Sequence, residues 1–259
     1  AGNRSALADP VELAPGDALV VATSGTTGAP KGVVLTHDAV AASALATNAR
    51  LGVDPARDRW LACLPLAHIG GLGVLTRALA SATPVEVRPA YDPDVAATLV
   101  SLVPTVLERH DTRRFRVVVV GGSGDWRARG ANVVHTYGMT ETGSGVVYDG
   151  LPLDGVEVRL DAVGQILLRG PMLLRGYRRT AGGLPAVDDP ADADGWFATG
   201  DLGSLDGDGR LSVFGRAGEV IVTGGEKVWP SAVERVLRGV AGVADVAVAG
   251  VEDPEWGQR

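Results

Sequence analysis

A decapeptide rich in glycine and hydroxyl groups, TSGTTGAPKG, occupies positions 23–32. Backbone N–H groups and hydroxyls in such a loop can cradle phosphate groups, and the ammonium group of Lys31 would add a positive charge. The spacing excludes a Walker A loop, because Gly25 is followed five positions later by Pro30, and Lys31 is followed by Gly32. A flexible surface loop has the same composition, so this segment alone leaves phosphate binding and a structural loop both open.

Other polar clusters follow short apolar runs further along the chain. The hexapeptide YGMTET at 137–142 supplies an aromatic ring, hydroxyl groups and the carboxylate of Glu141, which suit a nucleotide and a metal ion. The tripeptide TGD at 199–201 supplies a second carboxylate, which can only accept hydrogen bonds. Each short segment is also typical of a structural turn. Taken singly, His68 is more typical of a hydrogen-bonded structural histidine. Arg216, taken singly, is more typical of a solvated charge.

The apolar runs before these clusters predict the elements that position them. We expect strands at 17–22, 33–35, 60–64, 85–88, 116–120 and 133–136. We expect helices at 38–51 with Asp38 as N-cap, at 74–80, at 93–102 and from 104. This alternation is typical of an α/β fold with buried, largely parallel strands.

The texture of the sequence changes after residue 155. Short strands at 156–160, 165–169, 211–214 and 219–222 predict a β-rich subdomain, and DGDG at 206–209 predicts a hairpin turn rather than a calcium loop, because the EF-hand spacing is absent. A helix at 230–239 and a strand at 243–248 are expected to follow.

Composition disfavours several classes of protein. The chain of 259 residues has 24 Lys and Arg against 31 Asp and Glu, so general nucleic-acid binding is disfavoured. A single cysteine rules out an intramolecular disulfide framework and a cysteine-based zinc site. No apolar run approaches the roughly 20 residues that span a bilayer, and no signal sequence opens the chain, so we expect a cytoplasmic protein without a membrane partner.

Taken in order, the motifs resemble those of the ANL superfamily of adenylate-forming enzymes, which includes acyl- and aryl-CoA synthetases, peptide-synthetase adenylation domains and luciferases. The resemblance rests on TSGTTGAPKGVVLTH, YGMTET and GWFATGDLG, with Arg216 at the family's distance, and covers essentially the whole chain. It implies a large N-terminal domain of parallel α/β subdomains at 1–216, with the β-rich subdomain at about 151–215. A hinge and the start of a small mobile α+β C-terminal domain are implied at 217–259.

The resemblance also implies roles for individual residues. Tyr137 would stack on adenine, Asp201 would accept hydrogen bonds from the ribose hydroxyls, and Arg216 would reach the ribose or a phosphate. Glu141 would help to hold Mg²⁺. The implied catalytic residues are Lys31, Thr140, Glu141 and His68. The implied nucleotide-binding residues are Thr23, Ser24, Gly25, Thr26, Thr27, Gly28, Lys31, Gly121, Gly122, Ser123, Tyr137, Gly138, Thr140, Asp201 and Arg216.

The remaining implied residues concern the acid and coenzyme A. The segment PLAHIGGL at 65–72 resembles the family's acyl-pocket segment, with His68 at the mouth between the acyl and CoA sites. Gly224 and Gly225 would form part of the CoA tunnel, and Gly218 would be the hinge. The implied acyl-substrate residues are His68, Gly71, Gly122, Ser144, Gly145 and Val146.

Within the superfamily, residues 131–160 together with LAHIGGL and VPTVL are similar to the o-succinylbenzoate–CoA ligases of menaquinone biosynthesis in their actinobacterial form. The implied reaction joins a small carboxylic acid to ATP with Mg²⁺, giving an acyl-adenylate and pyrophosphate, after which the thiol of CoA displaces AMP. A homodimer is the family-based expectation. Another aryl- or acyl-CoA synthetase, an adenylation enzyme that loads a carrier protein, and a non-catalytic nucleotide-binding relative stay open as alternatives.

Three features depart from the family's pattern. The family carries a catalytic lysine near the end of its small domain, and no lysine follows Lys227, so we expect the chain to be incomplete after Arg259. The hinge position, usually Asp or Lys, holds Gly218, whose backbone freedom still permits a pivot. The segment between Gly121 and Tyr137 is too short for a helix between parallel strands, so we expect missing residues near 123–131, and also at 108–114 and 178–192.

Overall fold

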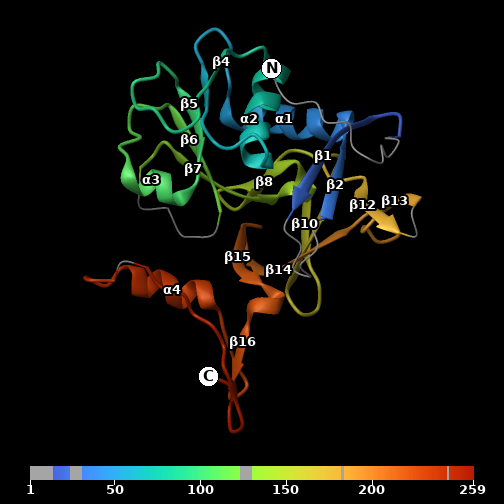
Figure 1. The fold of residues 1–259 in the computed structure, drawn as a ribbon, viewed down its shortest axis with the longest axis vertical. Helices are drawn as coiled ribbons and strands as arrows, with labels where there is room; N and C mark the ends of the chain where they lie inside the picture. Colours follow the sequence, from blue (N-terminus) through green and yellow to red (C-terminus); the bar gives the residue numbers. More distant parts are fainter. Residues whose placement is uncertain (1–13, 24–30, 123–129, 182–183, 244) are drawn as a thin grey trace.

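A computed structural model of the protein describes residues 14–23, 31–122, 130–181, 184–243 and 245–259. Within these ranges the chain forms one seven-stranded sheet and three four-stranded sheets (Figure 1). No helix in the described ranges is both long and apolar enough to cross a membrane.

The seven-stranded sheet has the strand order β4–β3–β5–β6–β7–β8–β9. Its strands are β3 (Trp60–Ala62), β4 (Val85–Val87), β5 (Leu99–Leu102), β6 (Val117–Gly121), β7 (Val133–Met139), β8 (Ser144–Tyr148) and β9 (Leu151–Pro152). The neighbours from β4 to β7 pair in parallel, whereas β8 and β9 pair antiparallel. Val118 and Val119 face opposite sides of β6 and both are buried, which explains the uninterrupted apolar run. The expected α/β class with largely parallel strands is confirmed.

Apolar side chains cover both faces of this sheet. On one face, α1 (His37–Leu51) and α2 (Ile69–Ser81) contribute to a core cluster with Trp60, Leu99 and Val119. On the other face, α3 (Pro104–Arg109) contributes Leu107 to a cluster that includes Val118. The helix α1 begins after Thr36, whose Oγ1 accepts a 3.0 Å hydrogen bond from the backbone N–H of Ala39. The N-cap is therefore Thr36 rather than Asp38, which lies in the first turn and complements the helix dipole.

The helix expected at 93–102 is wrong. Residues 93–98 form turns and bends, and Leu99–Leu102 is the strand β5, between β3 and β6. All of its four residues are buried, because the strand is covered on both faces. Pro93 resembles a helix start in the sequence, but the central position in the parallel sheet decides the conformation.

Two further sheets flank the first and contain the segments that carry the later motifs. One has the order β1–β2–β12–β13 and is built from β1 (Asp17–Thr23), β2 (Lys31–Thr36), β12 (Gly176–Ala181) and β13 (Leu184–Asp188). The other has the order β10–β11–β14–β15 and is built from β10 (Glu157–Leu160), β11 (Gln165–Arg169), β14 (Phe197–Leu205) and β15 (Leu211–Arg216). Neighbouring strands in both sheets pair antiparallel, and the expected turn at 206–209 joins β14 to β15.

The chain then passes through the short 3-10 helix η2 (Ala217–Glu219) into a small terminal sheet. Its strands are β16 (Ile221–Thr223), β17 (Glu226–Val228), β18 (Glu252–Asp253) and β19 (Gly257–Gln258). The helix expected at 230–239 is confirmed as α4 (Pro230–Arg238). In Figure 1 these elements extend away from the larger sheets, on the side of β15.

The strand expected at 243–248 is wrong for the part of it that the structure describes. The backbone groups there bond to side chains of α4 instead of to a neighbouring strand. The N–H of Val248 donates to Oε1 of Glu234 at 2.9 Å, and Arg238 donates to the carbonyl of Val246 at 3.4 Å. An apolar run without a ladder partner does not become a strand.

The connection from β6 to β7 is described only at Gly122 and at residues 130–132, and these form no helix. Of the segments in which missing residues were expected, 108–114 forms the end of α3 and the turn before β6. Most of 178–192 belongs to the β12–β13 hairpin.

Candidate active site

The sequence motifs meet where the three larger sheets adjoin. Lys31 begins β2, Tyr137 lies in β7, and Glu141 lies in the 3-10 helix η1 (Thr140–Thr142) that continues β7. Asp201 in β14 lies directly opposite Arg216, the last residue of β15. Side chains that are distant in sequence thus come from all three sheets to one region of the molecule.

The carboxylate of Asp201 is buried and holds two donors. Its Oδ2 accepts a 2.8 Å hydrogen bond from the phenol of Tyr137, and its Oδ1 lies 3.0 Å from Nε of Arg216. Arg216 is fixed in turn by a 2.8 Å hydrogen bond from Nη1 to the carbonyl of Thr199. Burial raises the pKa of the Asp201 carboxyl, against the opposing effects of the Tyr137 hydrogen bond and the Arg216 charge.

The Tyr137 phenol is a permanent donor. Burial, reinforced by the negative charge of Asp201, raises the pKa of Tyr137 far above its usual range. The hydroxyl therefore stays protonated through neutral and moderately alkaline pH.

A second tyrosine, Tyr177 in β12, joins Glu141 to Lys31. Its hydroxyl donates a 2.9 Å hydrogen bond to Oε1 of Glu141, and Nζ of Lys31 lies 5.0 Å from the centroid of its ring. Burial and then the charge of Glu141 raise the pKa of Tyr177, so this phenol also remains a donor. The backbone carbonyl of Glu141 accepts a 2.8 Å hydrogen bond from the N–H of Leu174. Sequence analysis missed Tyr177, because the β12 segment carries no motif.

The oxygen ligands available here suit a metal ion that is bound together with a nucleotide. In the described part of the chain they do not form a metal site made of protein ligands alone. The described residues contain no group of three or more His, Cys, Asp or Glu that could hold a metal ion. Mg²⁺ bound with phosphates commonly needs only one or two protein carboxylates. Glu141 provides one such carboxylate. Among the described residues, its Oε1 accepts a hydrogen bond from Tyr177, and no donor bonds to its other carboxylate oxygen. Lys31 contributes a positive charge, which is the kind of group that attracts phosphates.

A buried arginine forms a separate polar cluster that sequence analysis also missed. Arg77 in α2 is 2% exposed; its Nη2 donates to Oγ of Ser144 at 2.5 Å and its Nη1 to Oγ of Ser101 at 3.2 Å. Its guanidinium also lies 5.8 Å from the ring centroid of Trp60. Among the described residues no carboxylate lies within ion-pair distance of Arg77. A buried charge with only neutral partners is costly, and an anion would compensate it.

The α2 helix packs closely against β8 beside this arginine. A Cβ atom at Gly73 would lie 3.3 Å from Oγ of Ser144 and 3.5 Å from Nη2 of Arg77. Of the expected acyl-substrate residues, Ser144 is therefore the one that bonds to a buried charge. Ser144 is the first residue of β8 and has a φ of 152°, which is unusual for a residue with a side chain.

The other expected acyl-substrate residues have structural surroundings of their own. A Cβ at Gly71 would lie 2.4 Å from the carbonyl oxygen of Pro65, and a Cβ at Gly145 would lie 2.8 Å from Cβ of Thr136. Close backbone packing thus requires glycine at both positions. Three expected acyl-substrate residues remain. Val146 is buried in the core, and Gly122 has a φ of 114°. His68 is exposed and precedes α2.

The glycines expected at the CoA tunnel form a hairpin turn. Gly224 and Gly225 join β16 to β17 with φ values of 57° and 87°, and two positive values in succession are typical of a type I′ turn. Gly218 lies in η2, with open space where a Cβ would be.

The expected nucleotide-binding residues fall into two groups, those that the structure describes and those outside the described residues. Gly121 ends β6, Gly138 lies in β7, Thr23 ends β1 and Thr140 begins η1. The others, namely Ser24, Gly25, Thr26, Thr27, Gly28 and Ser123, lie outside the described residues.

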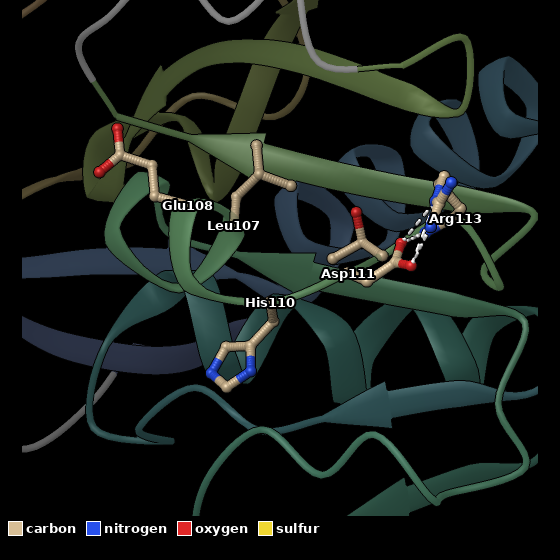
Figure 2. Close-up of a pocket in the computed structure, with 6 residues that line it drawn as sticks. Leu107, Glu108, His110, Asp111 and Arg113 are labelled. Atoms are coloured by element: carbon tan, nitrogen blue, oxygen red, sulfur yellow. Dashed lines mark hydrogen bonds and ion pairs between the residues drawn. The ribbon is translucent and has the colours of Figure 1, made fainter. Parts of the chain in front are cut away.

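Two surface hollows of the described structure lie away from these clusters. A hollow of about 240 Å³ at the end of α3 is lined by Leu107, Glu108, His110, Asp111, Thr112 and Arg113 (Figure 2). Figure 2 shows Arg113 facing Asp111, and its hydrogen bonds lower the pKa of Asp111 to about 2. A second hollow, of about 320 Å³, is lined by Gly130, Ala131, Val133, His135, Asp149 and Arg210. Neither includes a residue of the two clusters described above.

The sequence of this chain matches a known protein family. Residues 2–178 match the family described as AMP-binding enzyme. A probable 2-succinylbenzoate–CoA ligase of Mycobacterium tuberculosis (strain ATCC 25618 / H37Rv) is 42% identical, over 93% of this chain and 69% of the relative. A 2-succinylbenzoate–CoA ligase of Listeria monocytogenes is 35% identical, over 93% of this chain and 58% of the relative.

Solved structures agree with these sequence matches. The o-succinylbenzoate CoA synthetase of Bacillus subtilis, in complex with the acyl-adenylate intermediate, has a TM-score of 0.82 and 32% identity over 92% of this chain and 57% of that chain. The same enzyme with ATP and magnesium ion has a TM-score of 0.80 and 31% identity, over 92% and 58% of the two chains. The chain thus spans between 57% and 69% of the length of these relatives.

Proposed function

The chain belongs to the AMP-binding enzyme family, and from this premise we propose that the protein is an ATP-dependent, AMP-forming acid–CoA ligase acting on o-succinylbenzoate. The observation that carries the proposal is the meeting of Lys31, Glu141 and Asp201 with Arg216, four charged side chains from two of the sheets and from η1. Such a junction suits ATP, whose ribose and phosphates present hydroxyl groups and negative charges to different sides.

In this proposal the residues divide the nucleotide between them. Asp201, held by Tyr137 and Arg216, accepts hydrogen bonds from the ribose, because each carboxylate oxygen keeps a second acceptor position. Lys31 faces the phosphates. Glu141 binds the Mg²⁺ that accompanies ATP, and this ion neutralises negative charge as the carboxylate of the acid approaches the α-phosphate.

The acid is held at the second cluster. o-Succinylbenzoate carries two carboxylates, of which only one can react at a time, so the other requires a cationic partner. Arg77 provides a buried guanidinium without a carboxylate partner in the described structure, and Ser144 bonds to it. A fatty acid has no second carboxylate and would leave this charge uncompensated, which favours an acid with two carboxylates over a fatty acid.

We also propose the division of the chain at residues 216 and 217, with Gly218 in η2 as the pivot. The support is that η2 leads from the sheet that holds Asp201 to the small terminal sheet. A homodimer is proposed from the family alone, and a cytoplasmic location from the lack of an apolar run long enough to span a bilayer. Light scattering and cell fractionation test these two proposals.

The test is an assay of pyrophosphate release by the full-length protein with ATP, Mg²⁺ and a panel of acids, with and without CoA. The panel contains o-succinylbenzoate, benzoate, salicylate and short and medium fatty acids. Release with o-succinylbenzoate, followed by CoA-dependent thioester formation, is the expected result. Release with another acid alone would retain the ligase reaction and refute this substrate. ATP binding without release for any acid would favour a non-catalytic nucleotide-binding protein.

A further inference from the structure

We propose that Tyr177 is a positioning residue that holds the metal-binding carboxylate of Glu141 and the ammonium group of Lys31 in one fixed arrangement. The inference deepens the proposed function and rests on it. Its basis is that one side chain makes two separate contacts: the hydroxyl donates to Oε1 of Glu141 at 2.9 Å, and the ring lies 5.0 Å below Nζ of Lys31.

The sheet geometry explains how one tyrosine reaches both residues. Tyr177 in β12 is paired with Val33 of β2, and Lys31 lies two residues before Val33. Side chains two residues apart in a strand share a face, so Lys31 and Tyr177 are diagonal neighbours on the same face. A cation within about 6 Å of an aromatic centroid is attracted to the ring, which restricts where the flexible lysine side chain can go.

Glu141 is held at two points, its backbone carbonyl and its side chain, by the segment that contains Tyr177. The N–H of Leu174 donates to its backbone carbonyl, and the hydroxyl of Tyr177 donates to its side chain. A carboxylate oxygen that accepts a hydrogen bond from a phenol is fixed in direction, and its second oxygen then has a defined position for a metal.

The strand does not need the tyrosine hydroxyl to keep its place. Residues 176–178 pair with β2 along the backbone, and the preceding residue, Arg175, forms two 2.7 Å hydrogen bonds with the carboxylate of Asp17. A Cβ at Gly176 would lie only 2.5 Å from the carbonyl oxygen of Asp188, so the backbone is also packed tightly against β13. The hydroxyl of Tyr177 therefore serves Glu141 rather than the fold.

The two contacts can be removed one at a time. Tyr177→Phe removes the hydroxyl and keeps the ring beside Lys31, whereas Tyr177→Leu removes both. Tyr91→Phe is the matched control, because it removes a phenol that donates to the carbonyl of Asp111 at 3.3 Å, outside both clusters. Calorimetric titration of each full-length variant with Mg·ATP, and with ATP in EDTA, separates metal-dependent from metal-independent binding.

We expect Tyr177→Phe to weaken Mg·ATP binding about tenfold, the order expected for a hydrogen bond to a charged group, and to leave metal-free ATP binding within about twofold of wild type. Tyr177→Leu is expected to weaken both. In a Glu141→Gln background, Tyr177→Phe should have little further effect, because its partner carboxylate is already gone.

Three results would overturn the inference. They are wild-type binding of both ligands by Tyr177→Phe, equal weakening of both ligands by Tyr177→Phe, and an undiminished effect of Tyr177→Phe in the Glu141→Gln background. Each of these leaves the proposed function standing, provided that the wild-type protein binds Mg·ATP. Failure of the wild-type protein to bind either ligand would refute the proposed function and the inference with it.

Discussion

Replacing Arg77 with methionine should abolish recognition of a second carboxylate while leaving the fold intact. Methionine fills a similar elongated space but carries no charge. Removing one partner of a buried hydrogen-bonded charge pair costs about 2–5 kcal/mol, which corresponds to a fall in kcat/KM of roughly 30-fold to several thousand-fold. The guanidinium is 2% exposed and held by two hydroxyls, so the upper part of this range is expected.

The effect on stability should be small. Arg77 has no carboxylate partner in the described structure, so its removal leaves no buried charge behind. The loss of two hydroxyl contacts is offset by removal of a desolvated cation, and the free energy of unfolding should stay within about 1 kcal/mol of wild type.

The assay compares two acids in steady-state pyrophosphate release. One is o-succinylbenzoate, and the other is 4-oxo-4-phenylbutanoate, which lacks the carboxylate on the ring. Arg77→Met should lower kcat/KM for the first acid and leave the value for the second unchanged. Such a change isolates the contact with the second carboxylate, because both acids share the other groups.

Arg116→Met is the matched control for stability. Arg116 bonds to the side chain of Asp58, which is only 3% exposed, so this substitution leaves a buried carboxylate with one partner fewer. Arg116 itself is 42% exposed, so a loss of about 1–3 kcal/mol is expected, below the value for a fully buried pair. Selectivity between the two acids should not change. Equal losses of kcat/KM for both acids in Arg77→Met, or unfolding of that variant as severe as in the control, would refute the argument and make Arg77 a structural residue.

Two further predictions concern stability. Gly138→Ala should lower the free energy of unfolding by about 1–3 kcal/mol in urea denaturation, because its Cβ would lie 2.2 Å from the carbonyl oxygen of Ser144. Gly207→Ala, with open space around its Cβ, should be neutral, and equal effects of the two would contradict this explanation. Burial raises the pKa of Asp58, but hydrogen bonds from Arg116 and other donors outweigh it and lower the pKa overall. The resulting stabilisation is present above about pH 4 and lost as pH falls through the folded-state pKa. Asp58→Asn should therefore have a lower Tm than wild type at pH 6, and the difference should shrink towards pH 2.5; a constant difference would exclude this titration as its cause.

Some strands of the central sheet, such as β3 and β6, could be predicted from sequence because burial on both faces makes them continuous apolar runs. Val117–Gly121 is the clearest case. The same reasoning failed for 99–102, where a preceding proline and alanines favour a helix. There the identity of the element depends on its neighbours β3 and β6, which belong to other segments of the chain. Local preference decides less than the position in the sheet.

The residues of the candidate site also differ in whether the sequence alone could predict them. Lys31, Glu141 and Asp201 lie in motifs that can be found by residue type and spacing. Arg77 and Tyr177 lie outside these motifs. An arginine in an apolar helix and a tyrosine in a strand acquire their roles only from burial and from partners elsewhere in the chain. The sequence carries no local sign that Arg77 lacks a carboxylate partner.

The junction of three sheets also bears on how the molecule comes apart. Polar contacts between the three larger sheets meet in this cluster, and an apolar cluster with Val33 and Leu35 in β2, Phe197 in β14 and Met139 in β7 joins the same sheets. A ligand that contacts side chains from all three sheets would stabilise their association. The stabilisation is about 2.7 kcal/mol when the free ligand is at one hundred times its dissociation constant. We therefore expect bound nucleotide to make the unfolding of the three sheets more cooperative. In the proposed reaction, release of the nucleotide would remove this added stabilisation.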